Sequence, residues 1–176
     1  MVYRERSEEK RKVFMRRLKR ISAKNLVYAD ETGIEHCLVR KRARAPRGHR
    51  VTGKISGTKF KRTNIVSGLL LGKRAAPFQY SGSTDSALFE HWFENCLLKE
   101  IGRNKYIVMD NASFHRKSVL AALAESKKCR VIFLPPYSPD LNPIENKWAW
   151  LKHKLTDILP AFRSLDDAIW SAFQVD

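Results

Sequence analysis

Short apolar runs, each closed by turn residues or a carboxylate, recur along the chain and predict buried strands. The run "CRVIFL", for example, is rich in β-branched and aromatic residues and is soon followed by two prolines, so a strand that stops sharply is expected. By the same pattern we expect strands at residues 25–30, 34–39, 63–72, 105–110 and 129–134, with a shorter edge or hairpin segment at 76–83. A turn at Thr32 and Gly33 is expected between the first two strands.

Longer stretches between these runs carry apolar residues at helical spacing. The clearest is expected to begin at Thr84, as the N-cap, and to end at Gly102. Its apolar face, which we interpret as core rather than a cofactor site, consists of Leu88, Phe89, Trp92, Phe93, Cys96 and Leu97. Further helices are expected over residues 118–126, after Asn142 and from Ser164. Strands and helices that alternate in this way indicate an α/β domain.

The segment "LPPYSPDLNPIENKW", residues 134–148, joins the last expected strand to the next helix. Asn142 is expected to cap that helix, and Glu145 to lie in its first turn, where helix polarity favours an anion. An apolar stripe of Ile144, Trp148, Leu151 and Leu155 would dock the helix on the sheet. The loop therefore fixes Glu145 in space. A capping box of Asn142 and Glu145, serving only helix stability, is the alternative.

Composition changes this picture by pointing to a partner. The 176 residues suffice for one domain with a sizeable core. Lys and Arg number 34 against 18 Asp and Glu, so the formal net charge is +16 and nucleic acid is the expected partner. A ribosomal-type or merely basic protein is the alternative. Three scattered cysteines favour a reducing compartment, and no membrane span or signal peptide is recognised, so a cytoplasmic, nucleoid-associated location is expected.

The basic residues concentrate in two regions and on one helix. Residues 1–24 are dominated by charge, with Phe14, Leu18 and Ile21 at helical spacing, and predict a basic helical arm or linker ahead of a domain at 25–176. This arm is either solvated or in contact with DNA. A basic loop follows the first strands, and two further lysines lie on the helix after Asn142. The residues expected to contact DNA are Arg40, Lys41, Arg42, Arg44, Arg47, Lys147 and Lys152.

Three carboxylates occupy the positions where chemistry is expected. Asp30 and Asp110 each end a predicted strand, and Glu145 begins a predicted helix. In sheets covered by helices, functional groups gather outside the carboxyl ends of strands. A convergent acidic trio would repel itself and raise the pKa of at least one member unless a hard dication is bound, so the trio predicts a site for Mg²⁺ or Mn²⁺.

Each of these acids also has a plainer interpretation. Asp30 and Asp110 are both residue types that open turns. Glu31 is expected on the side of its strand opposite to Asp30, which makes Asp30 the preferred ligand. Asp140 is an alternative to Glu145, although it lies in the loop rather than at the helix start. His115 is either a residue that orients a carboxylate or phosphate, or a packing residue.

Three motifs together resemble the catalytic domain of DDE transposases of the mariner superfamily, in the bacterial insertion-sequence branch. They are "YADETG", "VMDNASFH" and "LPPYSPDLNPIENKWAWLK", and the likeness spans roughly residues 25–160. The 34 residues between Asp110 and Glu145 match the spacing of that family. The resemblance implies an RNase H-like fold, a mixed five-stranded sheet whose first three strands are antiparallel, flanked by helices.

The resemblance also implies a reaction and its parts. Asp30, Asp110 and Glu145 would be the catalytic, metal-binding triad that holds two Mg²⁺ or Mn²⁺ ions, with Asn111 and His115 as supporting residues. The domain would cut DNA strands at transposon ends and transfer the freed 3′-hydroxyl groups to target DNA, at a TA step. Double-stranded DNA, a second copy of the chain and a separate helix-turn-helix half would be its partners. The alternatives are an RNase H-like endonuclease that cuts without joining, and a non-catalytic DNA-binding protein derived from a transposase.

Overall fold

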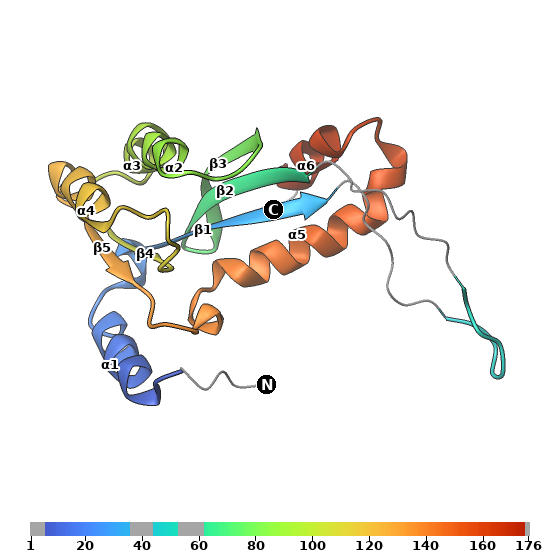
Figure 1. Cartoon of the computed structure of the whole chain (residues 1–176), viewed down its shortest axis with the longest axis horizontal. Coiled ribbons are helices and arrows are strands. Elements are labelled where there is room, and N and C mark those ends of the chain that lie inside the picture. The colour runs from blue at the N-terminus through green and yellow to red at the C-terminus, as the bar shows by residue number, and fades with distance from the viewer. Residues whose placement is uncertain (1–5, 36–43, 53–61, 175–176) are drawn as a thin grey trace.

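A five-stranded mixed sheet with helices on both faces forms the core of the computed structural model, which describes residues 6–35, 44–52 and 62–174 (Figure 1). The strands are β1 (Leu26–Glu35), β2 (Arg62–Leu70), β3 (Lys73–Ser81), β4 (Tyr106–Met109) and β5 (Arg130–Phe133). The main helices are α1 (Glu8–Leu18), α2 (Ser86–Trp92), α3 (Leu98–Ile101), α4 (Lys117–Ser126), α5 (Ile144–Ile158) and α6 (Leu165–Phe173). A π-helical turn, η2 (Phe93–Leu97), joins α2 to α3. Short 3₁₀ helices lie at η1 (Ala23–Asn25), η3 (Pro139–Leu141) and η4 (Leu159–Ala161).

The strand order is β3-β2-β1-β4-β5. β1, β2 and β3 pair antiparallel, and β4 and β5 join them in parallel. A tight hairpin connects β2 to β3 through Leu71 and Gly72, both at positive φ, as a two-residue turn between twisted strands requires. The predicted fold class is confirmed, and residues 76–81 of the segment predicted at 76–83 lie in β3, the edge strand of this hairpin.

β1 is longer than predicted and runs without interruption through the expected turn. Thr32 and Gly33 pair with Ile65 and Asn64 of β2, so the prediction of a turn there was wrong. Gly33 serves a close approach, because a Cβ at this position would lie 1.6 Å from the Arg62 Nε atom. Of the second strand predicted at 34–39, Ile34 and Glu35 belong to β1, and residues 36–39 lie outside the described residues.

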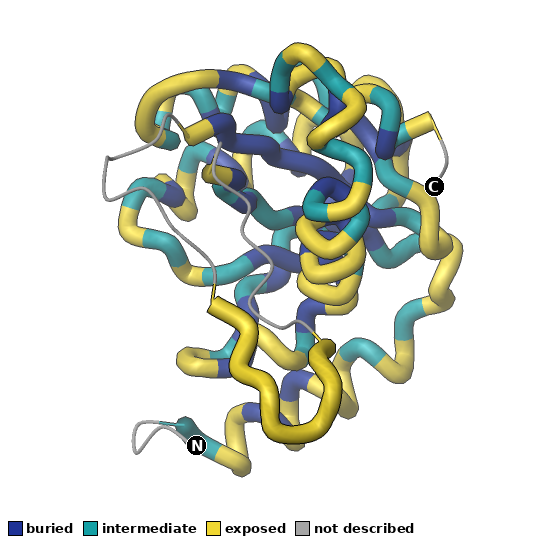
Figure 2. The backbone as a smooth tube through the Cα atoms, turned by 90° about the vertical axis from the view of Figure 1, so that its right-hand side faces the viewer, coloured by how far each residue is buried: buried dark blue, intermediate teal, exposed yellow. Residues whose placement is uncertain are grey.

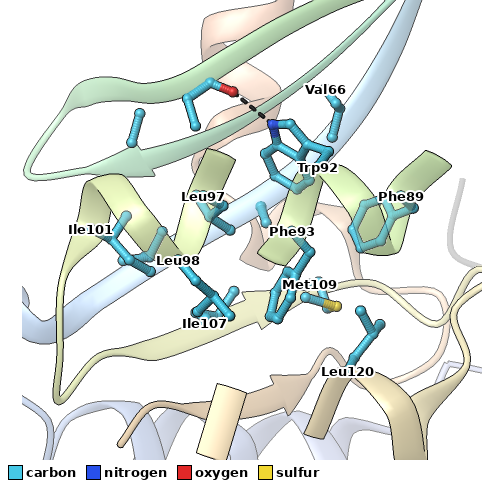
Figure 3. Close-up of a cluster of buried hydrophobic side chains, with 14 of the residues drawn as sticks. Val66, Phe89, Trp92, Phe93, Leu97, Leu98, Ile101, Ile107, Met109 and Leu120 are labelled. Atoms are coloured by element: carbon cyan, nitrogen blue, oxygen red, sulfur yellow. Dashed lines mark hydrogen bonds between the residues drawn. The ribbon is translucent and has the colours of Figure 1, made fainter. Parts of the chain in front are cut away.

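One face of the sheet is covered by α2, η2, α3 and α4. Trp92, Phe93 and Leu97 are almost fully buried there against Val27 and Val66 of the sheet (Figure 3). The Trp92 indole Nε1 donates to the Ala76 carbonyl oxygen across 2.7 Å. The buried indole N–H therefore has the acceptor that it needs. The predicted aromatic stripe is therefore core, as expected. Its helix is capped by Asp85 rather than Thr84, because the Asp85 side chain accepts from the Leu88 N–H.

The opposite face carries α5 and α6. Ile144, Trp148, Leu151 and Leu155 of α5 are all buried, which confirms the predicted stripe. Burial of a side chain of this size is worth about 1.5–3 kcal/mol each, so α5 is firmly held along the sheet (Figure 1). The last helix begins where predicted, since the Ser164 hydroxyl accepts from the Asp167 N–H at 3.1 Å.

The N-terminal segment forms a helix, α1, that packs on the sheet near β4 and β5 through Phe14. The division of the chain after residue 24 stays a prediction. Residues 44–52 are exposed throughout (Figure 2). No helix within the described residues is both long and apolar enough to cross a membrane.

Candidate active site

Strand pairing brings two of the three predicted carboxylates together. β1 and β4 are parallel neighbours, with Tyr28 beside Val108. Asp30 and Asp110 each lie two residues beyond this pair, Asp110 directly after β4, and the Asp110 charge acts on Asp30. Asp30 is within β1 rather than at its end, so that prediction was wrong in detail. The convergence it implied nevertheless holds, because β4 ends beside the middle of the longer strand.

Glu145 reaches the same place from the start of α5. Its neighbour Ile144 is fully buried, which anchors the first turn of α5 on the sheet. One helical turn later, the Trp148 indole Nε1 donates to Asp30 Oδ2 across 3.0 Å. The three carboxylates border one pocket of about 300 Å³, lined by Asp30, Asp110, Asn111, Ala112, Leu134, Pro135, Pro136, Tyr137, Ser138, Pro139, Asn142 and Glu145.

The acids in this region perturb one another. Burial, followed by the charges of Glu145 and Asp110, raises the pKa of Asp30 to about 7, and the Trp148 hydrogen bond opposes the rise only in part. The Asp30 carboxyl therefore holds its proton to a higher pH than an ordinary aspartate does. A dication between the acids would remove the repulsion and draw off the proton. Carboxylate oxygens are the ligands that Mg²⁺ and Mn²⁺ prefer, so the donor set fits such an ion.

Glu31 is a fourth acid that belongs to the same cluster. Its side chain leaves β1 on the side opposite to Asp30, as predicted, yet one of its oxygens lies within 4.8 Å of ligand atoms of both Asp110 and His115. Burial and the charges of Asp30 and Asp110 raise the pKa of Glu31 to about 8. Its Oε2 atom is buried without a hydrogen-bond partner. Glu31 therefore lies close to the candidate site even though its side chain leaves the strand on the side opposite to Asp30.

His115 is buried behind Asp110. Its Nδ1 atom lies 3.3 Å from Asp110 Oδ1 and 3.4 Å from the Asp110 carbonyl oxygen. Its ring packs against Phe89 and Phe114, with centroids 4.3 and 4.5 Å apart. Burial lowers the pKa of His115, and the Asp110 charge opposes that effect. The ring is thus held in one orientation beside the carboxylate.

Asn111 ties together the two strand exits that frame the pocket. Its Nδ2 donates to the Leu134 carbonyl oxygen across 2.5 Å, and its Oδ1 accepts from Lys117 Nζ at 2.8 Å. Asp110 Oδ1 also accepts from the Ala112 N–H at 3.0 Å. The turn that was the plainer interpretation of Asp110 is therefore present as well, and it restrains the same carboxylate that faces the pocket.

The helix start that carries Glu145 is built differently from the prediction. Pro143, not Asn142, occupies the N-cap position, and no side chain caps the helix. Asn142 is buried, with its Oδ1 atom unpartnered, so the alternative of a capping box is wrong. The Glu145 N–H instead donates to the backbone carbonyl of Asn142, and the Asn142 N–H donates to the Pro139 carbonyl of η3. Asp140 pairs with Arg11 and does not line the pocket.

The predicted DNA-contacting residues fall into three groups. Arg40, Lys41 and Arg42 lie outside the described residues, whereas Arg44 and Arg47 are exposed in segment 44–52. Lys152 is exposed on α5 and follows Glu145 by two turns, so it shares that side of the helix at a distance of about 10 Å along the axis. Lys147 is half-buried and points about 160° away from Glu145 around the helix.

Sequence reasoning missed three contributors to this region. Trp148 was assigned only to packing, although a buried indole N–H needs an acceptor, and that rule could have suggested a nearby carboxylate. Glu31 was set aside because strand alternation was treated as separation. Arg11 gave no local signal, because its partner Asp140 is distant in sequence.

The sheet order and the acidic pocket beside β4 define an RNase H-like domain. The same fold is found in the Mos1 transposase paired-end complex with left transposon end, with a TM-score of 0.70 and 21% identity over 88% of this chain and 51% of that chain. The catalytic domain of Mos1 mariner transposase gives a TM-score of 0.60 at 20% identity, over 88% of this chain and 76% of that one. These likenesses establish the fold.

The family follows from sequence. The model of the DDE superfamily endonuclease family matches residues 25–168, so the chain belongs to that family. An uncharacterized protein of Sinorhizobium fredii, y4pE/y4sA, is 31% identical over 88 residues, which cover 47% of this chain and 58% of that protein. The chain thus spans only about half to three fifths of that relative and of the Mos1 chain in the paired-end complex. The prediction of a DDE-type catalytic domain is confirmed at the level of the family.

Proposed function

We propose that this chain is the catalytic domain of a DNA transposase, in the bacterial insertion-sequence branch of the mariner superfamily. It would cleave DNA strands at transposon ends and join the freed 3′-hydroxyl groups to target DNA. One observation carries the proposal: Asp30, Asp110 and Glu145, from three distant parts of the chain, border one open pocket in a domain of the DDE endonuclease family.

The three carboxylates are proposed to be the catalytic residues and to hold two divalent ions, Mg²⁺ or Mn²⁺. Burial, followed by the charges of Glu145 and Asp110, raises the pKa of Asp30, and the repulsion among these acids supports a cation between them. Mos1 paired-end complexes with Mn and with Mg support the same choice of metals. When bound, such ions would activate the attacking hydroxyl or water and stabilise the leaving oxygen of an in-line displacement.

The protein's own part is to hold these oxygens in place. Trp148 fixes one oxygen of Asp30 by its 3.0 Å hydrogen bond. Asn111 and His115 support Asp110, the first by joining the exits of β4 and β5 and the second by packing behind the carboxylate. Substrate phosphate oxygens would complete the coordination from the open side of the pocket, because hard dications keep positions for them.

The net charge of +16 supports double-stranded DNA as the partner. Lys152, Lys147 and the basic segment that includes Arg44 and Arg47 are the proposed phosphate contacts. Transposon ends and target DNA would both be bound, with a second copy of the chain in the complex and a separate helix-turn-helix half for end recognition. A location at the nucleoid follows from a chromosomal substrate.

Incubation with supercoiled plasmid and short duplexes bearing free 3′-hydroxyl ends, in Mn²⁺ and then Mg²⁺, tests the proposal. Joined products are expected with the wild type and not with Asp110→Asn, which should retain salt-sensitive DNA binding. Asp85→Asn is the matched control, because Asn caps a helix as well as Asp does and Asp85 does not line the pocket. Nicking without joining would identify an endonuclease, and equal cutting by Asp110→Asn would refute the site. Binding with neither reaction would favour a non-catalytic DNA-binding protein.

A further inference from the structure

Arg11, on α1, is an almost fully buried arginine, with a side chain 6% exposed. Its guanidinium forms two parallel hydrogen bonds with Asp140, Nη1 to Oδ1 at 2.9 Å and Nη2 to Oδ2 at 2.6 Å. Arginine is rarely buried unless it is paired, and the two-pronged geometry is the strongest and most directional form of the pair. Arg11 therefore specifies where Asp140 lies relative to α1.

Apolar packing holds α1 in place beside this pair. Phe14, one helical turn after Arg11, is buried against Val108, Ile132 and Leu134. Leu141, the residue after Asp140, packs against the same cluster. α1 therefore contacts the connection between β5 and α5 in two ways, through the Arg11–Asp140 ion pair and through the apolar cluster that includes Leu141.

The 3₁₀ turn that contains Asp140 is connected to Glu145 by a short chain of backbone hydrogen bonds. The Asn142 N–H donates to the Pro139 carbonyl across 2.8 Å, and the Glu145 N–H donates to the Asn142 carbonyl across 3.1 Å. The prolines at 135, 136, 139 and 143 stiffen the same segment. Residues of this connection also form the wall of the pocket, from Pro135 to Pro139. A displacement of Asp140 should therefore displace Glu145 as well, because the segment between them is stiff.

We propose that Arg11 is a positioning residue for the candidate active site: by holding Asp140 it fixes the β5–α5 connection and, through it, Glu145. The inference rests on the proposed function, since it concerns the same carboxylates. On this proposal α1 contributes to the geometry of the candidate active site. The arm expected from the sequence supplied no such role, because its charges suggested only solvent or DNA as partners.

Calorimetric titration with Mn²⁺ tests the first step. Arg11→Glu places a negative charge against Asp140 and should weaken Mn²⁺ binding about fivefold, within the range of couplings between residues of one network. Arg11→Glu with Asp140→Arg restores an opposite pair and should recover most of the affinity. Lys12→Glu, the same charge change at an exposed neighbouring position, should leave the affinity unchanged. Equal losses in the Arg11 and Lys12 variants would overturn the inference, since a general charge effect would explain both.

A Glu145→Gln background tests the second step. If Arg11 acts through Glu145, Arg11→Glu should cause no further loss of Mn²⁺ affinity there, and a full additional loss would overturn the inference. Should Arg11→Glu not fold, Asp140→Asn in the same two backgrounds answers the same question.

Amide hydrogen exchange gives a readout that needs no metal. The amides of Leu141, Asn142 and Glu145 should exchange faster in the Arg11→Glu variant and return to wild-type rates in the swapped pair, while β2 stays protected. Wild-type protein that binds no Mn²⁺ would count against the proposed function, and unchanged exchange at these amides would count against the Arg11 inference, so the two failures are distinguishable.

Discussion

The indole of Trp148 donates its N–H to the carboxylate of Asp30, with 3.0 Å between Nε1 and Oδ2. This bond joins α5 to the middle of β1. Because Trp148 lies three residues after Glu145 on the same helix, a single buried side chain relates the positions of two candidate metal ligands. The packing of the apolar stripe of α5 and the geometry of the acidic site therefore depend on the same side chain, Trp148.

Trp148→Phe should separate packing from chemistry. Phenylalanine retains most of the buried ring but cannot donate to Asp30, and that bond lowers the Asp30 pKa. The pKa of Asp30 should therefore rise further, and Mn²⁺ affinity at pH 7 should fall about tenfold, since a hydrogen bond to a charged group is worth about 1.5–3 kcal/mol. Calorimetry measures the affinity. Trp170→Phe, at an exposed position on α6, is the control, and equal effects of both changes would contradict the role given to Trp148.

The raised pKa values of Asp30 and Glu31 predict that the folded protein loses stability as the pH rises, whereas carboxylates with lowered pKa values have the opposite effect. Between pH 4 and about 7 for Asp30, and up to about 8 for Glu31, the folded protein binds protons that the unfolded chain has released. Without divalent cations the free energy of unfolding should therefore fall as the pH rises through this window. Asp30→Asn removes one charge from the cluster and should raise the melting temperature by about 4 °C at pH 8.5, with little change at pH 5.

Divalent cations should cancel this pH dependence. Millimolar Mn²⁺ should bind the ionised carboxylates of the folded state only, so the melting temperature should rise more at pH 8 than at pH 5. Scanning calorimetry with chelator or with Mn²⁺ at each pH measures the effect. An equal Mn²⁺ shift in an Asp30→Ala/Asp110→Ala double variant would contradict binding at this cluster.

Local patterns in the sequence located much of the candidate site. The apolar run before Asp110 and the prolines before Glu145 are both local signals, and both carboxylates lie where these signals put them. The stripe from Ile144 to Leu155 likewise determines which face of α5 meets the sheet. These predictions succeeded because each depends on residues within one or two turns of the chain.

The errors arose where distant residues decide the outcome. Thr32 and Gly33 look like a turn until Arg62 of the neighbouring strand is placed over Gly33. Asn142 looks like a side-chain cap, but its backbone carbonyl accepts from the Glu145 N–H in place of the side chain. Arg11 looks solvated in the sequence, but it pairs with Asp140, which is 129 residues away along the chain. Contacts of this kind have no periodicity, and so the sequence alone could not supply them.

Two substitutions of His115 can separate the packing role of its ring from the role of the nitrogen beside Asp110. His115→Phe should keep the packing on Phe89 and remove a buried Nε2 atom that lacks a partner, so the melting temperature should hold or rise. It also removes the nitrogen beside Asp110, and Mn²⁺ affinity should fall about tenfold, at the lower end of the effect typical of residues that support metal ligands. His115→Asn should do the reverse, since its amide approximates Nδ1 but loses the ring. A packing role alone would leave the Mn²⁺ affinity of His115→Phe at the wild-type value.

Lys152 and Lys147 give the sharpest test of how DNA lies on the domain. Lys152 shares the Glu145 side of α5 and is exposed, whereas Lys147 points away and is half-buried. If DNA phosphates cross the pocket, Lys152→Ala should reduce the slope of log K against log salt by about 1 and weaken binding of every duplex alike. Lys147→Ala should change the slope less, and Lys99→Ala on α3, across the sheet, should not change it. Fluorescence anisotropy between 50 and 200 mM KCl, a range in which such contacts are resolved, measures all three, and a larger effect of Lys99 would move the DNA path to the other face.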